Sequence, residues 1–332
     1  MDSNLLNKAN STIELDSSII KIIILTSVGL ISALCFGYFL KLFILESQPY
    51  FLLFSFLAVI GFLALYLLDI FFIKTIWLTN LIVFLEMLAF LAPFYDRLSM
   101  IIGLASLIGF LLLVWGIYSG RNELEDRLKI KFWEVSKKSL PKAITGLALI
   151  ATIVSVGFFS LEENNFFISK PVFEKGVSSL FNFDLVQNFL PGFNLSLPVE
   201  DLIKNIAINQ IEGNSELKIL PSSAKAALIN QTVKELKNKI SDFISMPLNL
   251  KAKASEALYE IMVKKISQSP ENNKSLVLII IAVLIFLTII SLSWLIRFIA
   301  TCPAYIIYEI CLALGFSTIM MENKSKEIIV LK

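Results

Sequence analysis

The sequence predicts an all-α polytopic membrane protein, and three observations support this class. Of the 332 residues, 56% are hydrophobic and only 17% are charged, whereas about 25% is usual for soluble domains. Several apolar segments reach the roughly 20 residues that a helix needs to cross a bilayer. One long polar segment, 162–274, interrupts this pattern. We therefore expect six membrane spans, a seventh candidate span, and a small helical domain inserted between spans five and six.

The apolar segments give the expected spans in order. The first, Ile19–Leu45, contains Lys21 and Lys41, whose long side chains can reach the two membrane interfaces. The seventh candidate segment is shorter than the others and carries Glu309, so the sequence leaves open whether it crosses the membrane. The remaining expected spans are Tyr50–Leu68, a segment within Thr75–Phe94, Met100–Tyr118, Ala143–Leu161, Leu276–Ile296 and the seventh candidate Ala304–Met321.

A basic loop between spans four and five sets the expected orientation. The stretch 120–142 contains seven Lys and Arg residues, and short loops rich in these residues stay in the cytoplasm. Its residues Leu124, Leu128, Phe132 and Val135 share one helical face, which predicts an amphipathic segment on the inner leaflet. This orientation makes the N-terminus cytoplasmic and segment 162–274 extracytoplasmic.

The extracytoplasmic segment is predicted to be a helical bundle. It holds 13 lysines and 13 acidic residues, so its net charge is zero. Apolar residues between Ala226 and Phe243 recur at steps of three and four, which indicates an amphipathic helix. A second helix over 250–262 is expected to form a hairpin with it, and a third begins near Val199. A phenylalanine-rich stretch from Phe173 fits either the core of this domain or the surface of the outer leaflet.

Small residues in the first span indicate close helix packing. Gly29, Ala33 and Gly37 recur at steps of four residues, a pattern that lets another helix approach closely. Packing within the same chain is the main interpretation, and homodimerisation is the alternative.

The composition excludes several classes of chemistry. The chain has no histidine, which removes Ser-His-Asp and Cys-His nucleophile pairs and histidine zinc sites. Its cysteines, Cys35, Cys302 and Cys311, lie in apolar segments and fit buried positions better than a metal site. No glycine-rich phosphate loop is present, and a net charge of +2 shows no bias toward nucleic acid. We expect no enzyme activity, no catalytic residue, no metal and no cofactor.

Glu86 is the polar residue that most needs an explanation. It lies in the middle of the third span within "NLIVFLEMLAFLAPFYDR", where an ionised carboxylate costs several kcal/mol. We therefore expect it to face the bundle interior. One interpretation makes Glu86, with Asn80 and Glu309, a proton or cation site of a transporter or channel. The other is a neutral acid hydrogen-bonded between helices, which is favoured because the spans show no internal repeat.

Two stretches resemble known sequences. "RNELEDRLKIKFWEVSKKSLPKAIT", before the fifth span, and "ENKSKEIIVL", at the C-terminal end, are similar to stretches in uncharacterised multi-pass membrane proteins of candidate-phyla-radiation bacteria. The resemblance implies a bacterial cytoplasmic membrane. It implies no activity and no functional residue.

The expected function follows from the motif-free domain that is tethered to the membrane at both ends. The leading hypothesis is a non-enzymatic scaffold of the cell envelope, with the bilayer and either an envelope protein or a second copy as partners. A proton- or cation-coupled transporter using Glu86 is the alternative. The expected parts are a cytoplasmic tail (1–18), a four-helix block (19–120), the basic cytoplasmic loop (121–142), the fifth span (143–161), the extracytoplasmic domain (162–274), a C-terminal transmembrane hairpin (275–321) and a tail (322–332).

Overall fold

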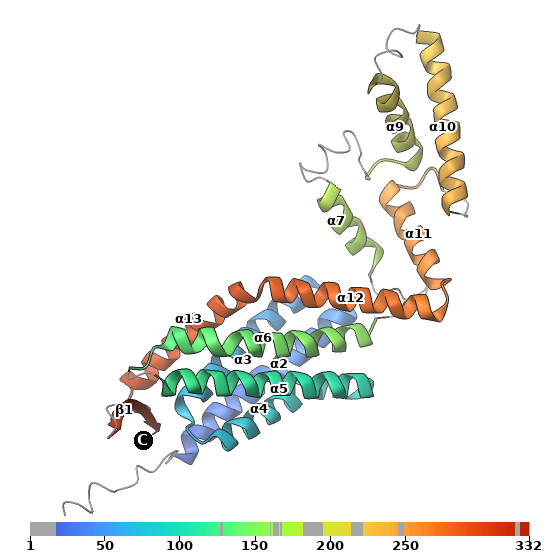
Figure 1. Cartoon of the computed structure of the whole chain (residues 1–332). Helices are drawn as coiled ribbons and strands as arrows, with labels where there is room; N and C mark the ends of the chain where they lie inside the picture. Colours follow the sequence, from blue (N-terminus) through green and yellow to red (C-terminus); the bar gives the residue numbers. More distant parts are fainter. Residues whose placement is uncertain are drawn as a thin grey trace, which may run out of the picture. The chain divides into compact units, whose positions relative to one another are not determined.

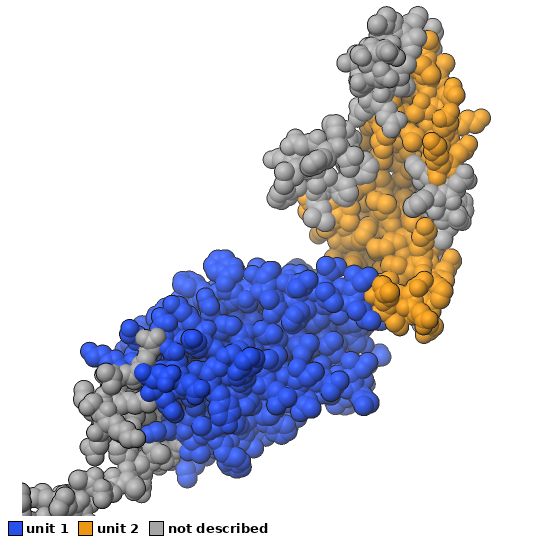
Figure 2. Space-filling model, viewed as in Figure 1, with its two compact units in different colours: residues 1–158, 278–332 blue, residues 159–277 orange. Residues whose placement is uncertain are grey.

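Figure 1 presents a computed structural model of the chain, which describes residues 18–126, 129–159, 161, 166, 168–181, 195–213, 222–244, 249–322 and 326–331. Two compact units are distinguished by colour in Figure 2: unit 1 contains residues 1–158 and 278–332, and unit 2 contains residues 159–277. Seven of the described helices are long and apolar enough to cross a membrane. The chain is thus an all-α polytopic membrane protein, as the sequence predicts.

Unit 1 is a helical bundle. Short turns join consecutive helices, so α2, α4 and α6 run opposite to α3 and α5. In the described residues α2 packs against α3 and α4, and α5 packs against α6 (Figure 1). These elements are α2 (Ile19–Glu46), α3 (Pro49–Phe72), α4 (Ile76–Leu91), the 3₁₀ helix η1 (Ala92–Arg97), α5 (Met100–Glu125) and α6 (Phe132–Gly157).

The predicted basic loop 121–142 is largely helical. Helix α5 continues to Glu125, and α6 begins at Phe132 rather than at Ala143. Phe132 and Val135 are buried in the bundle core instead of lying on the inner leaflet, and Leu128 lies outside the described residues. Pro141 lies inside α6. A membrane bundle tolerates a proline within a span, because neighbouring helices can satisfy the backbone groups that it frees.

The predicted C-terminal transmembrane hairpin does not form. Only Leu292, in a right-handed helical conformation, separates α12 (Glu271–Ser291) from α13 (Ser293–Ala313). A single residue of this conformation cannot reverse the chain, and Figure 1 shows the two helices following one another in the same direction. The seventh segment also ends earlier than expected, because α13 stops at Ala313.

A two-stranded antiparallel hairpin follows α13 and was missed by the sequence analysis. Its strands are β1 (Ser317–Glu322) and β2 (Lys326–Leu331), with Ser317 opposite Leu331. The Nζ of Lys21 donates a hydrogen bond to the carbonyl oxygen of Phe316 at 2.6 Å. The last residues of α13 and the first turn of α2 therefore lie at the same end of the bundle.

Unit 2 contains four described helices. Its core cluster is formed by buried apolar residues of α9, α11 and the segment that precedes α9, and these are Leu195, Val199, Leu202, Ile203, Ala254 and Ala257. Lys170 on α7 forms an ion pair with Glu256 on α11, and this hydrogen bond holds the pKa of the Lys170 ammonium above its usual range. The helices are α7 (Lys170–Phe181), α9 (Val199–Gly213), α10 (Ser222–Ile244) and α11 (Ala254–Ser267).

The starts of α9 and α11 cap each other through four backbone hydrogen bonds. The N–H groups of Val199 and Glu200 donate to the carbonyls of Ala252 and Leu250. The N–H groups of Ala254 and Ser255 donate in the same way to the carbonyls of Leu197 and Leu195. The donors of the second pair lie 55 positions after those of the first, as Ala254 lies after Val199. The acceptors of the second pair lie 55 positions before those of the first. Such reciprocity is the signature of a local two-fold relation between two helix starts.

The same relation extends to helix packing and to sequence. Helix α7 packs against α11, and α10 packs against α9, so the expected pairing of α10 with α11 in one hairpin is wrong. The segments "NLSLPVEDLI" (194–203) and "NLKAKASEAL" (249–258) share an initial Asn-Leu and an acidic residue in the first helical turn. Unit 2 therefore contains a local structural correspondence between its two helix starts.

Candidate functional site

Glu86 lies on α4 and is fully buried, with 0% of its surface exposed. Its carboxyl group faces Gly29 on α2, where a Cβ atom would stand only 1.9 Å from Glu86 Oε1. The absence of a side chain at Gly29 thus makes room for the acid. The span formed by α4 and η1 runs from Ile76 to Arg97, which places Glu86 at its midpoint. The burial of Glu86 confirms the expected inward orientation.

A second acid, Asp69, is buried in the last turn of α3 with 1% of its surface exposed. Its carboxyl group lies close enough to that of Glu86 for the two to affect each other electrostatically, and no described residue forms a hydrogen bond with the carboxyl oxygens of either acid. Asp69 was not among the predicted site residues, because the second span was expected to end at Leu68. Helix α3 continues to Phe72, and this extra turn carries Asp69 into the bundle.

Arg121 places a positive charge near Asp69. It is 6% exposed and attracts Asp69 electrostatically. Its guanidinium donates hydrogen bonds to the carbonyl oxygens of Ile73 and Lys74 and to Thr79 Oγ1. Arg121 therefore ties the end of α5 to the turn between α3 and α4, although the sequence analysis assigned it to a cytoplasmic loop.

Tyr66 completes the group. It is fully buried, and its hydroxyl donates a hydrogen bond of 2.6 Å to the carbonyl oxygen of Leu113. It lies in the same buried region as Glu86 and Asp69. We call Tyr66, Asp69, Glu86 and Arg121 the buried acid cluster. It joins α3, α4 and α5 in the half of the bundle that contains the α3–α4 turn.

The other predicted polar residues do not join the cluster. Asn80 is six residues before Glu86 on α4, about 120° around the helix axis, and its Oδ1 is buried without a hydrogen-bond partner in the described chain. Glu309 is exposed on α13 and hydrogen-bonds with Tyr305. The hydroxyls of Ser106, Ser155 and Thr288, on other spans, donate to carbonyls one turn earlier in their own helices.

The small-residue ladder of α2 faces α4. Ala33 is fully buried, and a Cβ at Gly37 would stand 2.2 Å from the carbonyl oxygen of Phe90. This surface is occupied within the chain, which confirms the prediction of internal packing. The same contact brings Gly29 next to Glu86.

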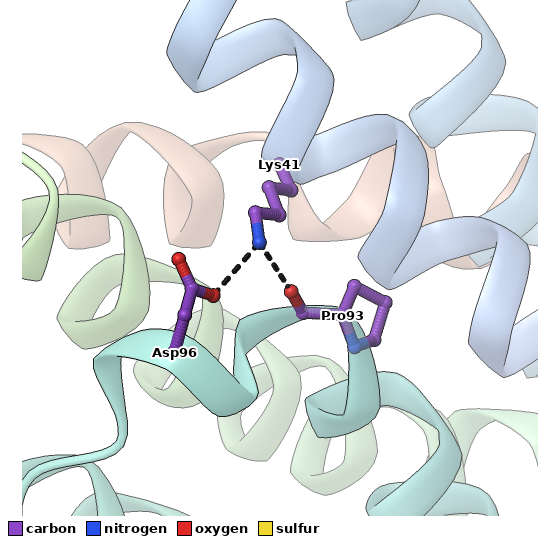
Figure 3. A network of polar contacts seen from close by, with 3 residues as sticks. All are labelled: Lys41, Pro93 and Asp96. Carbon is purple, nitrogen blue, oxygen red and sulfur yellow. Dashed lines mark hydrogen bonds and ion pairs between the residues drawn. The ribbon is translucent and has the colours of Figure 1, made fainter.

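Polar contacts mark the end of the bundle opposite to the cluster. The Nζ of Lys41 donates hydrogen bonds of 2.7 Å both to Asp96 Oδ1 and to the carbonyl oxygen of Pro93 (Figure 3). Lys21, at the other end of α2, contacts Phe316. The two lysines of the first span therefore lie at opposite ends of the bundle, as expected for residues that reach the two interfaces.

The cluster does not line the apolar cavity found between described helices of the bundle. That cavity, of about 610 Å³, is lined by residues of α2, α3, α6, α12, Leu292 and α13, and by none of the four cluster residues. In the described ranges no group of three Cys, Asp or Glu side chains is arranged to hold a metal ion. Two neighbouring acids shielded from water form an arrangement that can take up a proton, and a closed helix interface is also where a structural acid would lie.

Comparisons of the chain with protein-family models, with curated proteins and with solved structures gave no match. The chain's own geometry therefore carries the functional argument.

Proposed function

We propose that this protein is a non-enzymatic scaffold of a bacterial cell envelope, in which the membrane bundle anchors unit 2 and unit 2 binds a partner. One observation carries the proposal: α7 and α10 are amphipathic, yet none of their side chains whose burial is described is fully buried. Amphipathic helices with incompletely covered apolar faces are typical of surfaces that bind another protein.

The packing of α10 supports this proposal. Val233 and Leu236 contact the core of unit 2. Ile229 belongs to the same apolar stripe of α10, but it is only partly covered and is not part of that core. On α7, Val172 is 50% exposed. A partner that covered these side chains would bury apolar area that the fold of unit 2 leaves open.

The proposed orientation rests on the distribution of charge. Lys and Arg residues are concentrated between α5 and the first turns of α6, which favours a cytoplasmic location for that end of the bundle. The N-terminus would then be cytoplasmic and unit 2 extracytoplasmic. The resemblance to membrane proteins of candidate-phyla-radiation bacteria favours the bacterial cytoplasmic membrane as the location.

Crosslinking of the full-length protein in native membranes, followed by co-purification, tests the scaffold. Ile229→Glu places a charge on the open stripe and should reduce the crosslinked species several-fold. Asn230→Glu adds the same charge at a neighbouring exposed position and should leave the yield unchanged. Recovery of monomer alone under mild conditions would exclude the scaffold, and equal yields from both variants would exclude α10 as its binding surface.

The second candidate function is proton- or cation-coupled transport through the buried acid cluster. The observation that favours it is that the buried Glu86 and Asp69 carboxyls have no hydrogen-bond partner among the described residues. In proteoliposomes with an internal pH-sensitive dye, Glu86→Gln should abolish proton flux. Glu309→Gln, which alters an exposed acid of α13, should not change it. Flux that is absent from the unmodified protein, or unchanged in Glu86→Gln, would eliminate this function.

A further inference from the structure

The 610 Å³ cavity of the bundle is a groove that opens sideways. Its floor includes Leu63, Leu147 and Ala148, which are 0%, 7% and 2% exposed. Its rim includes Leu52 and Leu53, which are 48% and 56% exposed. The groove therefore has a buried floor and an open edge on the side that a bilayer would surround. We call it the lateral groove.

The lateral groove is unsuited to water. Among the described residues that line it, only Ser55 and Thr288 have polar side chains, and the Thr288 hydroxyl already donates to the carbonyl oxygen of Leu284 at 2.7 Å. A buried water needs two to four polar partners. Protein interiors are also close-packed, so a space of this size does not stay empty. The occupant must be apolar.

The dimensions select a single hydrocarbon chain over a helix. A helix about 10 Å across that filled 610 Å³ would be only about 8 Å long, which is fewer than two turns. Along α3 the lining extends from Pro49 to Leu63, a distance of about 21 Å at 1.5 Å per residue. One leaflet of a bilayer core is about 15 Å thick. The groove thus begins at the α2–α3 turn and is deep enough for a chain that spans one leaflet.

We propose that the lateral groove binds one acyl chain of a membrane phospholipid, with the headgroup beside the turn that precedes Pro49. The chain would fill the space between α3, α6 and the junction of α12 with α13 at Leu292. It would supply packing contacts that the protein itself does not provide there. This site is separate from the buried acid cluster, and it does not depend on the proposed function of unit 2.

Photocrosslinking tests the assignment. The full-length protein is reconstituted in vesicles of phosphatidylethanolamine and phosphatidylglycerol that contain a trace of phospholipid with a diazirine on one acyl chain. After illumination, adducts are mapped by mass spectrometry. We expect the yield per residue on Leu52 and Leu53 to exceed that on the similarly exposed Leu104 and Leu107 of α5 by roughly tenfold.

Matched variants separate groove binding from ordinary lipid contact. Ala148→Phe fills the floor, and Leu52→Trp obstructs the rim without altering the buried core, so the second variant remains informative if the first fails to fold. Either change in a folded protein should remove the enrichment, whereas Leu104→Trp should preserve it. Equal labelling of the groove and of α5 would overturn the proposal. Protein–protein crosslinks from groove residues in place of lipid adducts would overturn it as well, because a second protein would then be the occupant.

Discussion

At the scale of single residues, two glycines of α2 determine how closely α4 can approach. A Cβ at Gly37 would collide with the backbone carbonyl of Phe90, which can move only with its helix, whereas a Cβ at Gly29 would collide with the end of the Glu86 side chain. Overpacking of this kind costs about 1–3 kcal/mol. We expect both Gly37→Ala and Gly29→Ala to lower the free energy of unfolding, but for different reasons.

A double-mutant cycle distinguishes the two causes. In a Glu86→Ala background the Gly29→Ala substitution should become nearly neutral, because the colliding carboxyl is gone, while the cost of Gly37→Ala should not change. Thermal unfolding in one fixed lipid or detergent measures both. Gly103→Ala is the control, since no atom of another segment lies within 4 Å of the added methyl. A Gly29→Ala cost that persisted without Glu86 would show that the acid does not lie against α2.

The residues of the cluster differ in how far the sequence could predict them. The position of Glu86 follows from its place in one apolar run, because either boundary of that run puts it near the bilayer centre. Asp69 and Arg121 lie close to helix ends. A shift of a few residues in the expected end of a helix decides whether such a residue is assigned to a turn or to a buried helical position. Their burial depends on contacts between α3, α4 and α5, which a single sequence does not specify.

At the scale of elements, the reciprocal caps of α9 and α11 give a second prediction. Pro198 precedes α9 at the position that Lys253 occupies before α11, and Lys253 already has the φ of −59° that proline requires. Lys253→Pro leaves all four capping bonds in place. We expect it to stabilise unit 2 by about 0.4–1 kcal/mol, because it restricts the unfolded chain.

The neighbouring substitution provides the contrast. Ala254→Pro also places proline at a helix start, where its ring is accepted, but it removes the N–H that donates to the Leu197 carbonyl. Loss of that bond should destabilise the pairing by about 1–3 kcal/mol, since the carbonyl loses its partner. Amide hydrogen exchange of α9 and α11 in the full-length protein measures both effects. Equal exchange in the two variants would mean that the capping bonds add nothing to stability.

Sequence patterns predicted amphipathic helices well and their pairing poorly. The helix over α10 follows from its spacing of apolar residues. Its packing against α9 rather than α11 does not follow, because the starts of α9 and α11 are joined by backbone pairing at Pro198 and Lys253, which has no side-chain signal. For α6, the lysines and Pro141 indicated a boundary after residue 142. The helix begins at Phe132 because Phe132 and Val135 pack in the bundle core, and this contact outweighs the local signal.

At the scale of the whole chain, the path of α12 and α13 determines on which side of the membrane the C-terminal end lies. Because α2 to α6 alternate in direction, α6 ends at the opposite side of the bundle from the start of α2. The contact of Lys21 with Phe316 places the end of α13 beside that start. Together α12 and α13 therefore carry the chain across the bundle once, and we expect both chain ends on the same side.

Cysteine labelling with a membrane-impermeant maleimide tests this topology in intact spheroplasts, in a background without the native cysteines. Gln48→Cys, in the α2–α3 turn, and Lys251→Cys, in unit 2, should react from outside, because each occupies an exposed position on the proposed extracytoplasmic side. Asp126→Cys and a protease-sensitive tag fused to the C-terminus should react only after permeabilisation. A tag cleaved in intact spheroplasts would require α12 and α13 to cross separately, which would contradict the single passage implied by Leu292 and by the Lys21–Phe316 contact.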